Sequence, residues 1–239
     1  MRSIVYAGND FSDFSSAEVV ARSANPIIAE FMRVPGRAGA LVTSGYVPPV
    51  DVTVRLFMDP GYKPSSGGLS QLRAKVRSWL CWPGGGNLIL PDDPEIEYAD
   101  AMLVGASDWS DLFEAGSCEL TFTLFDPIGY GMERVELGPD FVVGGDWPTY
   151  PEFSIVANGG AYIELGYLWH GRRIRVEGPF VSGDVITIDC AGEAVTVNGA
   201  DARDLVALGS DFFAFEPGDT HISCLGFFEV ETRFTERWA

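Results

Sequence analysis

LSQLRAKVRSWLCWPGGGNLILPDDPEIEYADAML, residues 69–103, combines a helical pattern with two strand patterns. Residues 69–80 space their apolar side chains three and four positions apart, which predicts a short helix with one buried face. Pro83 and the three following glycines end the helix, because proline lacks an amide donor and glycine tolerates turn conformations. Strands are expected at 87–90 and 98–104, on either side of an acidic turn. The apolar face of the predicted helix consists of Leu69, Leu72, Val76, Trp79 and Leu80.

Short strand patterns separated by glycine and proline account for most of the other residues. Glycine supplies 28 and proline 15 of the 239 residues, which favours strands and turns over a helical bundle. Apolar and polar residues alternate most clearly in VDVTVRLF, residues 50–57, and CELTFTLF, residues 118–125. The N-terminal half is further expected to contain strands at 2–7 and 28–34 and long loops at 33–49 and 58–68.

The C-terminal half reads as a series of short strands. Asn158-Gly159-Gly160 predicts a tight hairpin between strands at 153–157 and 161–165. Ala191-Gly192-Glu193 predicts a second hairpin between strands at 185–190 and 194–198. Further strands are expected at 173–176, 212–215, 221–225 and 227–234.

The predicted fold is mainly β, with a domain boundary in residues 138–151, which hold three prolines and three glycines. The N-terminal domain, 1–138, is expected to be β-sandwich-like with one short helix. The C-terminal domain, 139–239, is expected to be a β-sandwich or jelly roll, because its strands are short and regularly spaced. A hydrophobic content of 46% suffices for one or two cores.

The charge of the chain argues against one class of function. Sixteen basic and 34 acidic residues give a net charge of −18, and a protein this acidic is not expected to hold DNA or RNA through phosphate contacts. The surplus of acids is explained either by solubility or by a surface that DNA passes without adhering. No run resembles a signal peptide or a membrane span, so we expect synthesis in the cytoplasm and no membrane association. The four cysteines lack CxxC spacing and are expected to be reduced thiols, three of them pointing inward.

The chemically active residue types form no motif of known mechanism. His170 and His221 do not lie at ligand spacing from another donor, and His221 is expected to face solvent. The acidic run at residues 92–97 lacks the pattern of a calcium-binding loop, so a solvated turn is expected there. No nucleotide-binding glycine motif and no serine-nucleophile motif is found. We therefore predict no enzymatic activity, no metal and no cofactor.

A few basic and aromatic residues are candidates for contacts with other proteins. Arg173 and Arg175 alternate with Ile174 and Val176, so they lie on the polar face of a strand, either solvated or docking an acidic neighbour. Trp82 and Trp109 lie beside turns and are candidates for an interface.

Taken in order, these segments resemble the distal tail protein (Dit) family of long-tailed, non-contractile phages. The resemblance covers nearly the full chain, and each segment is weak alone, whereas their order and spacing are fairly specific. In the N-terminal half it rests on AGNDFSDFSSAEVV (7–20), VPGRAGALVTSGY (34–46), WLCWPGGGNLILPDDPEIEYADAML (79–103) and ELTFTLFDPIGYG (119–131). In the C-terminal half it rests on YPEFSIVANGGAYIELGY (150–167), SGDVITIDCAGEAVTVNGAD (182–201), FFAFEPGDTHIS (212–223) and RFTERW (233–238).

The resemblance implies a structural protein of the virion tail tip. The N-terminal domain would form a ring, usually of six copies, and the C-terminal domain would be a galectin-like jelly roll outside it. The ring would join the tail tube to the tail-tip hub and let DNA pass, with the tape measure and receptor-binding proteins as further partners. Contacts are expected from the loops at 33–49 and 58–68 and from the residues named above, so the candidate interface is Arg37, Tyr46, Tyr62, Lys63, Trp82, Trp109, Arg173 and Arg175.

Two departures and two alternatives remain. Thr220-His221 stands where the family pattern has Asn-Thr, a change of little consequence. A length of 239 residues leaves no room for the inserted domains of members that bind host sugars, so this chain is not expected to recognise a cell surface alone. A lectin-like adhesion module, binding sugar on a tryptophan platform, is the main alternative, and a tail-associated hydrolase is the other.

Overall fold

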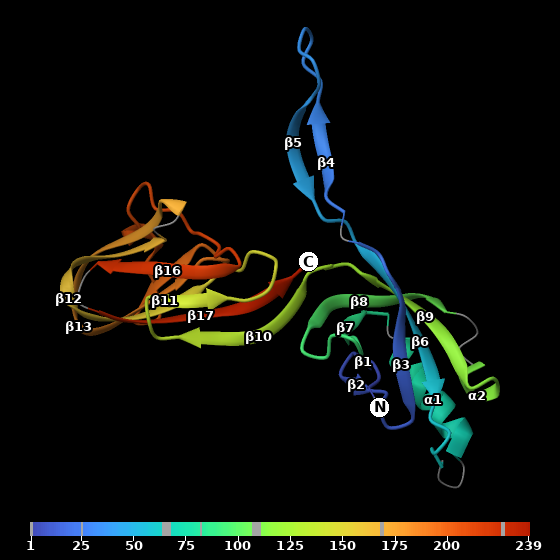
Figure 1. Ribbon diagram of the computed structural model, residues 1–239. Coiled ribbons are helices and arrows are strands. Elements are labelled where there is room, and N and C mark those ends of the chain that lie inside the picture. The colour runs from blue at the N-terminus through green and yellow to red at the C-terminus, as the bar shows by residue number, and fades with distance from the viewer. Residues whose placement is uncertain are drawn as a thin grey trace. The chain divides into compact units, whose positions relative to one another are not determined.

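The computed structural model describes residues 2–24, 26–63, 68–81, 83–106, 111–167, 170–225 and 228–239, except the side chain of Phe228. The chain is mainly β, as predicted, and divides into two compact units, Met1–Tyr130 with Ala239 and Gly131–Trp238 (Figure 1). Neither described α-helix has the length and hydropathy of a membrane span. The sequence predicts a domain boundary in residues 138–151, and the two compact units divide after Tyr130, inside β10 (Gly129–Glu136).

The N-terminal unit contains one antiparallel sheet in the order β3–β6–β9–β8–β7–β1–β2. Two further strands, β4 (Ile28–Met32) and β5 (Leu41–Tyr46), pair only with each other. The helices are α1 (Gly68–Leu80) and the short α2 (Asp111–Glu114). The sheet strands are β1 (Val5–Tyr6), β2 (Asn9–Asp10), β3 (Ser15–Arg22), β6 (Val50–Met58), β7 (Gly86–Ile89), β8 (Glu97–Ala106) and β9 (Ser117–Leu124).

The predicted alternation decides which face of this sheet is buried. In β6 the side chains of Val50, Val52, Val54 and Leu56 are at most 5% exposed, and β9 alternates in the same way. Helix α1 covers the buried face with Leu72, Val76 and Leu80, as its spacing predicted. Leu69 is the exception: in the first turn of the helix it is half exposed.

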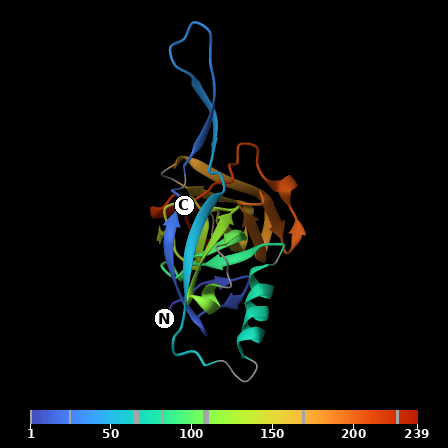
Figure 2. The same ribbon diagram turned by 90° about the vertical axis from the view of Figure 1, so that its right-hand side faces the viewer.

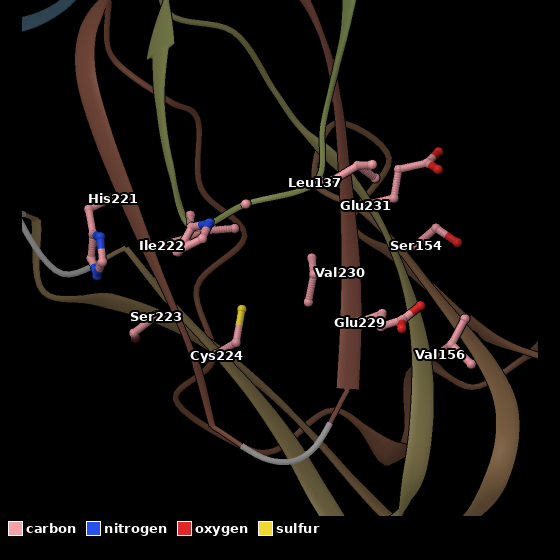
Figure 3. A pocket seen from close by; sticks show the side chains of 12 residues that line it. Leu137, Ser154, Val156, His221, Ile222, Ser223, Cys224, Glu229, Val230 and Glu231 are labelled. Atoms are coloured by element: carbon pink, nitrogen blue, oxygen red, sulfur yellow. The ribbon is translucent and has the colours of Figure 1, made fainter.

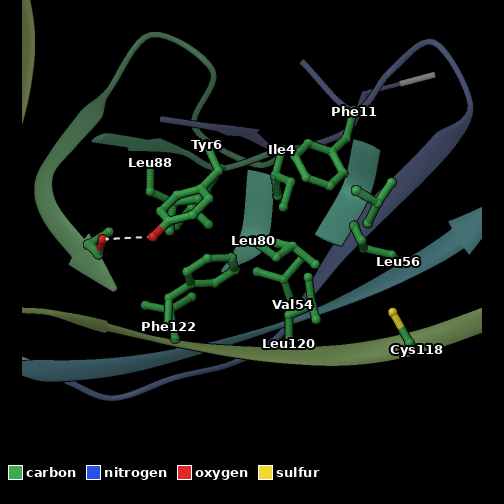
Figure 4. Packing of buried hydrophobic residues seen from close by; sticks show 14 of the residues in the cluster. Ile4, Tyr6, Phe11, Val54, Leu56, Leu80, Leu88, Cys118, Leu120 and Phe122 are labelled. Atoms are coloured by element: carbon green, nitrogen blue, oxygen red, sulfur yellow. Dashed lines mark hydrogen bonds between the residues drawn. The ribbon is translucent and has the colours of Figure 1, made fainter. Parts of the chain in front are cut away.

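The sheet curves around its own core. Tyr6 on β1 and Phe122 on β9 are separated by β7 and β8 in the strand order, yet their ring centroids lie 5.0 Å apart (Figure 4). The Tyr6 hydroxyl donates a hydrogen bond to the carbonyl oxygen of Ala101 at 3.3 Å, so the buried phenol is satisfied. Opposite halves of one strongly curved sheet therefore supply the two sides of the core.

The C-terminal unit is a β-sandwich built around two long strands, β12 (Glu152–Tyr167) and β13 (Arg172–Asp189). Residues 152–157 of β12 pair with β17, whereas residues 164–167 pair with β16, so β12 passes from one sheet into the other. The remaining elements are β10 (Gly129–Glu136), β11 (Asp140–Val143), β14 (Ala194–Val197), β15 (Ala200–Asp201), β16 (Gly218–Leu225), β17 (Phe228–Trp238) and the 3₁₀ turn Arg203–Leu205.

The predicted hairpin at residues 158–160 is wrong. The glycines lie inside β12, where its pairing with β13 is irregular between Val156 and Asn158 and again between Gly160 and Tyr162. Gly159 and Gly160 have φ of 89° and 147°, which glycine adopts without a side-chain clash. Asn and Gly are residue types that commonly form hairpin turns. In this chain they allow one strand to bend between two sheets.

Other differences concern strand boundaries. Residues 173–176 and 185–189 belong to the single strand β13, which ends one residue before the predicted 185–190 strand does. Strands β10 and β11 were not predicted. Residues 212–215 form no strand. Phe213 and Phe215 are nevertheless fully buried, since their rings pack into the core from an irregular segment. The predicted hairpin at 191–193 is confirmed by the pairing of β13 with β14.

Candidate assembly interface

The least covered part of the described structure is the ribbon formed by β4 and β5, which we call the arm. Every residue of both strands is exposed, and the arm continues beyond β3 and β6 (Figures 1 and 2). Its cross-strand partners include Ile28 with Tyr46 and Phe31 with Val42. The large apolar side chains at least 36% exposed on the arm or just before it are Ile27, Ile28, Phe31, Met32, Leu41, Val42 and Tyr46.

Prolines mark the root of the arm. Pro26 precedes β4, and Pro48 and Pro49 lie between β5 and β6. Since proline has no amide hydrogen, it cannot donate to a strand ladder, and the β3–β6 pairing does not run on into β4 and β5. The arm is therefore a separate two-stranded element, not a continuation of the main sheet.

A ribbon of this kind needs a covering surface. An isolated two-stranded hairpin is marginally stable in water, and contiguous exposed apolar side chains mark sites of protein association. The charge of the arm also differs from that of the chain: Arg33 and Arg37 against Glu30 give residues 26–48 a net charge of +1, compared with −18 for the whole chain. The arm thus offers an apolar, weakly basic surface in a strongly acidic protein.

Two of the candidate interface residues, Arg37 and Tyr46, lie on this element. Arg37 is exposed in the turn of the arm, and Tyr46 is 52% exposed at its base. Tyr62 is half-buried with its ring 6.2 Å from that of Phe14, whereas the neighbouring Lys63 is exposed. Trp82 and Trp109 lie outside the described residues.

The last two candidates, Arg173 and Arg175, lie on β13 with the predicted orientation. Ile174 and Val176, which alternate with the two arginines, are fully buried. The Arg175 guanidinium lies 2.8 Å from Glu177 and 3.7 Å from the centroid of the Tyr162 ring. Its hydrogen bond to Glu177 raises the Arg175 pKa above its usual value. Because Arg175 covers one face of Tyr162, that face is not open to a sugar ring.

Sequence reasoning missed the apolar part of the arm. Residues 33–49 were expected to form a loop, and that expectation is wrong for 41–46, which form β5. The signal was present: IAEFM and LVTSGY are strand-like and flank PGRAGA, a turn-like sequence. Because the candidate residues were chosen among arginine, lysine, tyrosine and tryptophan, Phe31 and Val42 were not singled out, although they are 61% and 71% exposed.

Two other groups considered for chemistry, the acidic turn and His221, make ion pairs within the chain. Arg22 lies 3.3 Å from Asp92 and 2.9 Å from Asp93, so part of the acidic turn is neutralised. His221 is only about one-third exposed and lies 2.5 Å from Asp140, instead of facing solvent freely. Within the described residues no group of three or more His, Cys, Asp or Glu side chains could hold a metal.

All four cysteines are free, as expected. Burial raises the pKa of the Cys118 and Cys224 thiols to about 11 and that of Cys190 to about 12. Thiols with such values are almost entirely protonated at neutral pH and are poor nucleophiles. Cys118, Cys190 and Cys224 thus behave as small apolar residues.

Comparisons with known proteins identify a matching family model and similar structures. Residues 144–238 match the family model described as siphovirus-type tail component, C-terminal domain (SPP1 Dit). No match is found among curated protein sequences. The whole chain is similar in structure to the Dit protein (gp 19.1) of phage SPP1, with a TM-score of 0.72 and 19% identity over 99% of each chain. That protein is described as a paradigm of the hub adsorption apparatus in phages that infect Gram-positive bacteria.

A more remote similarity is found to the baseplate of phage P2 in its activated conformation, with a TM-score of 0.43 and 10% identity over 92% of this chain and 90% of that chain. The sequence match over the C-terminal unit and the SPP1 Dit fold over the whole length agree with each other. The C-terminal unit thus matches the siphovirus-type tail component, C-terminal domain, and the whole chain has the fold of the SPP1 Dit protein.

Proposed function

We propose that copies of this chain associate into a closed ring, of six copies, that joins the tail tube to the tail-tip hub and lets DNA pass through its lumen. The observation that carries the proposal is the arm, whose exposed apolar side chains have no covering partner among the described residues of the same chain. A second copy of the chain is the simplest cover, because it is present wherever the first is.

The charge of the arm favours a head-to-tail contact. Two arms packed on each other would bring like net charges together, whereas an arm on the body of a neighbour joins a basic surface to an acidic one. A contact between two different surfaces is heterologous, and repeating it around a rotation axis closes a ring. The arm is a projecting element of the kind that can reach such a neighbour.

Passage of DNA requires a surface without free cations. The net charge of −18 motivates the proposal that acidic residues line the lumen and repel the phosphates. Several arginines of the N-terminal unit are also neutralised by carboxylates: Arg55 lies 3.1 Å from Glu18 and 2.5 Å from Glu119. Such pairs reduce the number of free cations available to bind a passing nucleic acid.

The remaining partners follow from the same placement in the tail. Ring copies would contact the tube protein on one side and the hub protein on the other, with the tape measure and receptor-binding proteins as further neighbours. Assembly would take place in the host cytoplasm before the virion is released. No enzymatic step is needed for any of these contacts.

The mass of the purified chain in solution tests the proposal. Light scattering at several concentrations should give one assembled species of about six times the monomer mass of 25.9 kDa. A species of 25.9 kDa at every concentration would overturn ring formation. Sugar binding by such a monomer would favour the lectin alternative instead.

A further inference from the structure

A groove of about 840 Å³ opens on the C-terminal unit, separate from the arm. Figure 3 shows Ile222 and Cys224 of β16 on one side and Val230 of β17 on the other, with Leu137 at one end. The strands β16 and β17 both pair with β12, but with different halves of it, so they diverge into different sheets. Their divergence leaves the space between them.

The floor of the groove is apolar. Ile222 is 1% exposed and belongs to the core, and the half-buried Cys224 and Val230 pack against the same core. Apolar side chains are also exposed at the groove: Leu137 is 76% and Val156 44% exposed, and both line it. The groove therefore offers an apolar seat for a side chain from outside.

The rim of the groove is acidic. Glu229 and Glu231 stand on the β17 side, and the β16 side carries His221 in contact with Asp140. Glu231 is paired with Arg233 at 2.7 Å, while Glu229 makes no ion pair with any described residue. No lysine or arginine is found among the described residues that line the groove. An occupant with positive charges beside its apolar anchor would complement this rim.

Resting on the tail placement proposed above, we propose that this groove binds an extended segment of another tail protein, with a large apolar side chain seated on Ile222, Cys224 and Val230 and lysine or arginine beside it at Glu229. The apolar floor supplies affinity through burial, and the acidic rim selects the charge of the flanking residues. The contact is independent of ring closure, since every lining residue belongs to one unit of one chain.

The experiment uses the full chain with Cys81→Ser, which removes the exposed thiol, and two synthetic peptides of sequence KVFVK and EVFVE. We expect KVFVK to bind at least roughly tenfold more tightly than EVFVE in calorimetry. Glu229→Lys should abolish the preference, and Leu137→Ser should weaken KVFVK binding.

Matched controls are Asp211→Lys and Leu208→Ser, both exposed residues that do not line the groove. They should leave peptide binding unchanged. Equal binding of both peptides, binding unaffected by Glu229→Lys, or no binding of KVFVK overturns the proposal. Ring formation is scored separately, from the mass in solution.

Discussion

Serine at both Phe31 and Val42 should convert the assembled protein into a monomer. The two side chains are cross-strand partners on the arm, and they are 61% and 71% exposed in the single chain. Covering a side chain of this size contributes about 1.5–3 kcal/mol. Losing two of them from each contact should weaken association by roughly 100-fold or more. Light scattering of the variant at the concentration where the unmodified chain is assembled gives the answer.

The control for the arm variant replaces two apolar residues that are equally exposed elsewhere. Val181 is 66% and Leu208 104% exposed, and neither belongs to the arm. The double serine variant of these residues should assemble like the unmodified chain. If the Phe31/Val42 variant also assembles normally, the arm does not hold the copies together.

The largest loss of stability is expected for Phe215→Ala. Phe215 is fully buried, and its ring lies within 6.1 Å of five other aromatic rings, measured between centroids. Removing it should lower the free energy of unfolding of the C-terminal unit by about 3–5 kcal/mol. The free energy of unfolding of a whole domain is about 5–15 kcal/mol, so the variant would lose a large part of its stability. The rings around Phe215 are those of Phe141, Phe153, Tyr167, Phe213 and Phe234.

Urea unfolding measures this loss, with Tyr150→Ala as the matched control. Tyr150 is 49% exposed, so its truncation should change the free energy of unfolding by less than about 1 kcal/mol. Phe215→Leu should fall between the two, because it keeps most of the buried volume. Equal stability of Phe215→Ala and Tyr150→Ala would show that the aromatic cluster does not carry the core.

Much of the N-terminal unit could be predicted because its local patterns agree with its tertiary structure. The alternation in residues 50–57 and 118–125 identifies the buried faces of β6 and β9, which are also neighbours in the sheet. The helical spacing around Leu72, Val76 and Leu80 survives in α1 for the same reason. In these segments one burial pattern satisfies both the local conformation and the core.

The errors occur where tertiary structure overrides a local signal. Gly159 and Gly160 are equally compatible with a hairpin turn and with a bend within β12. Only the pairing of β12 with β13, β16 and β17 decides between the two. Phe213 and Phe215 look like a strand because they alternate, yet they enter the core from an irregular segment. A pattern of burial alone does not specify the hydrogen-bond partner of the backbone.

The candidate interface was predictable only in part. Arg37 and Tyr46 lie on the arm, but its apolar side chains look in sequence like those of any core strand. Whether an apolar strand is buried or projects from the fold depends on its neighbours, which a single sequence does not contain. The prolines at 26, 48 and 49 are the local sign that the ladder stops there.

Hydrogen exchange of the arm amides tests most directly whether a second copy covers it. Residues 28–32 and 41–46 pair only with each other, so they should exchange rapidly in a monomer. In the assembled protein we expect them to exchange at least roughly 100-fold more slowly than in the monomeric Phe31/Val42 serine variant. Equally rapid exchange of these amides in a stable oligomer and in the monomer would contradict the account.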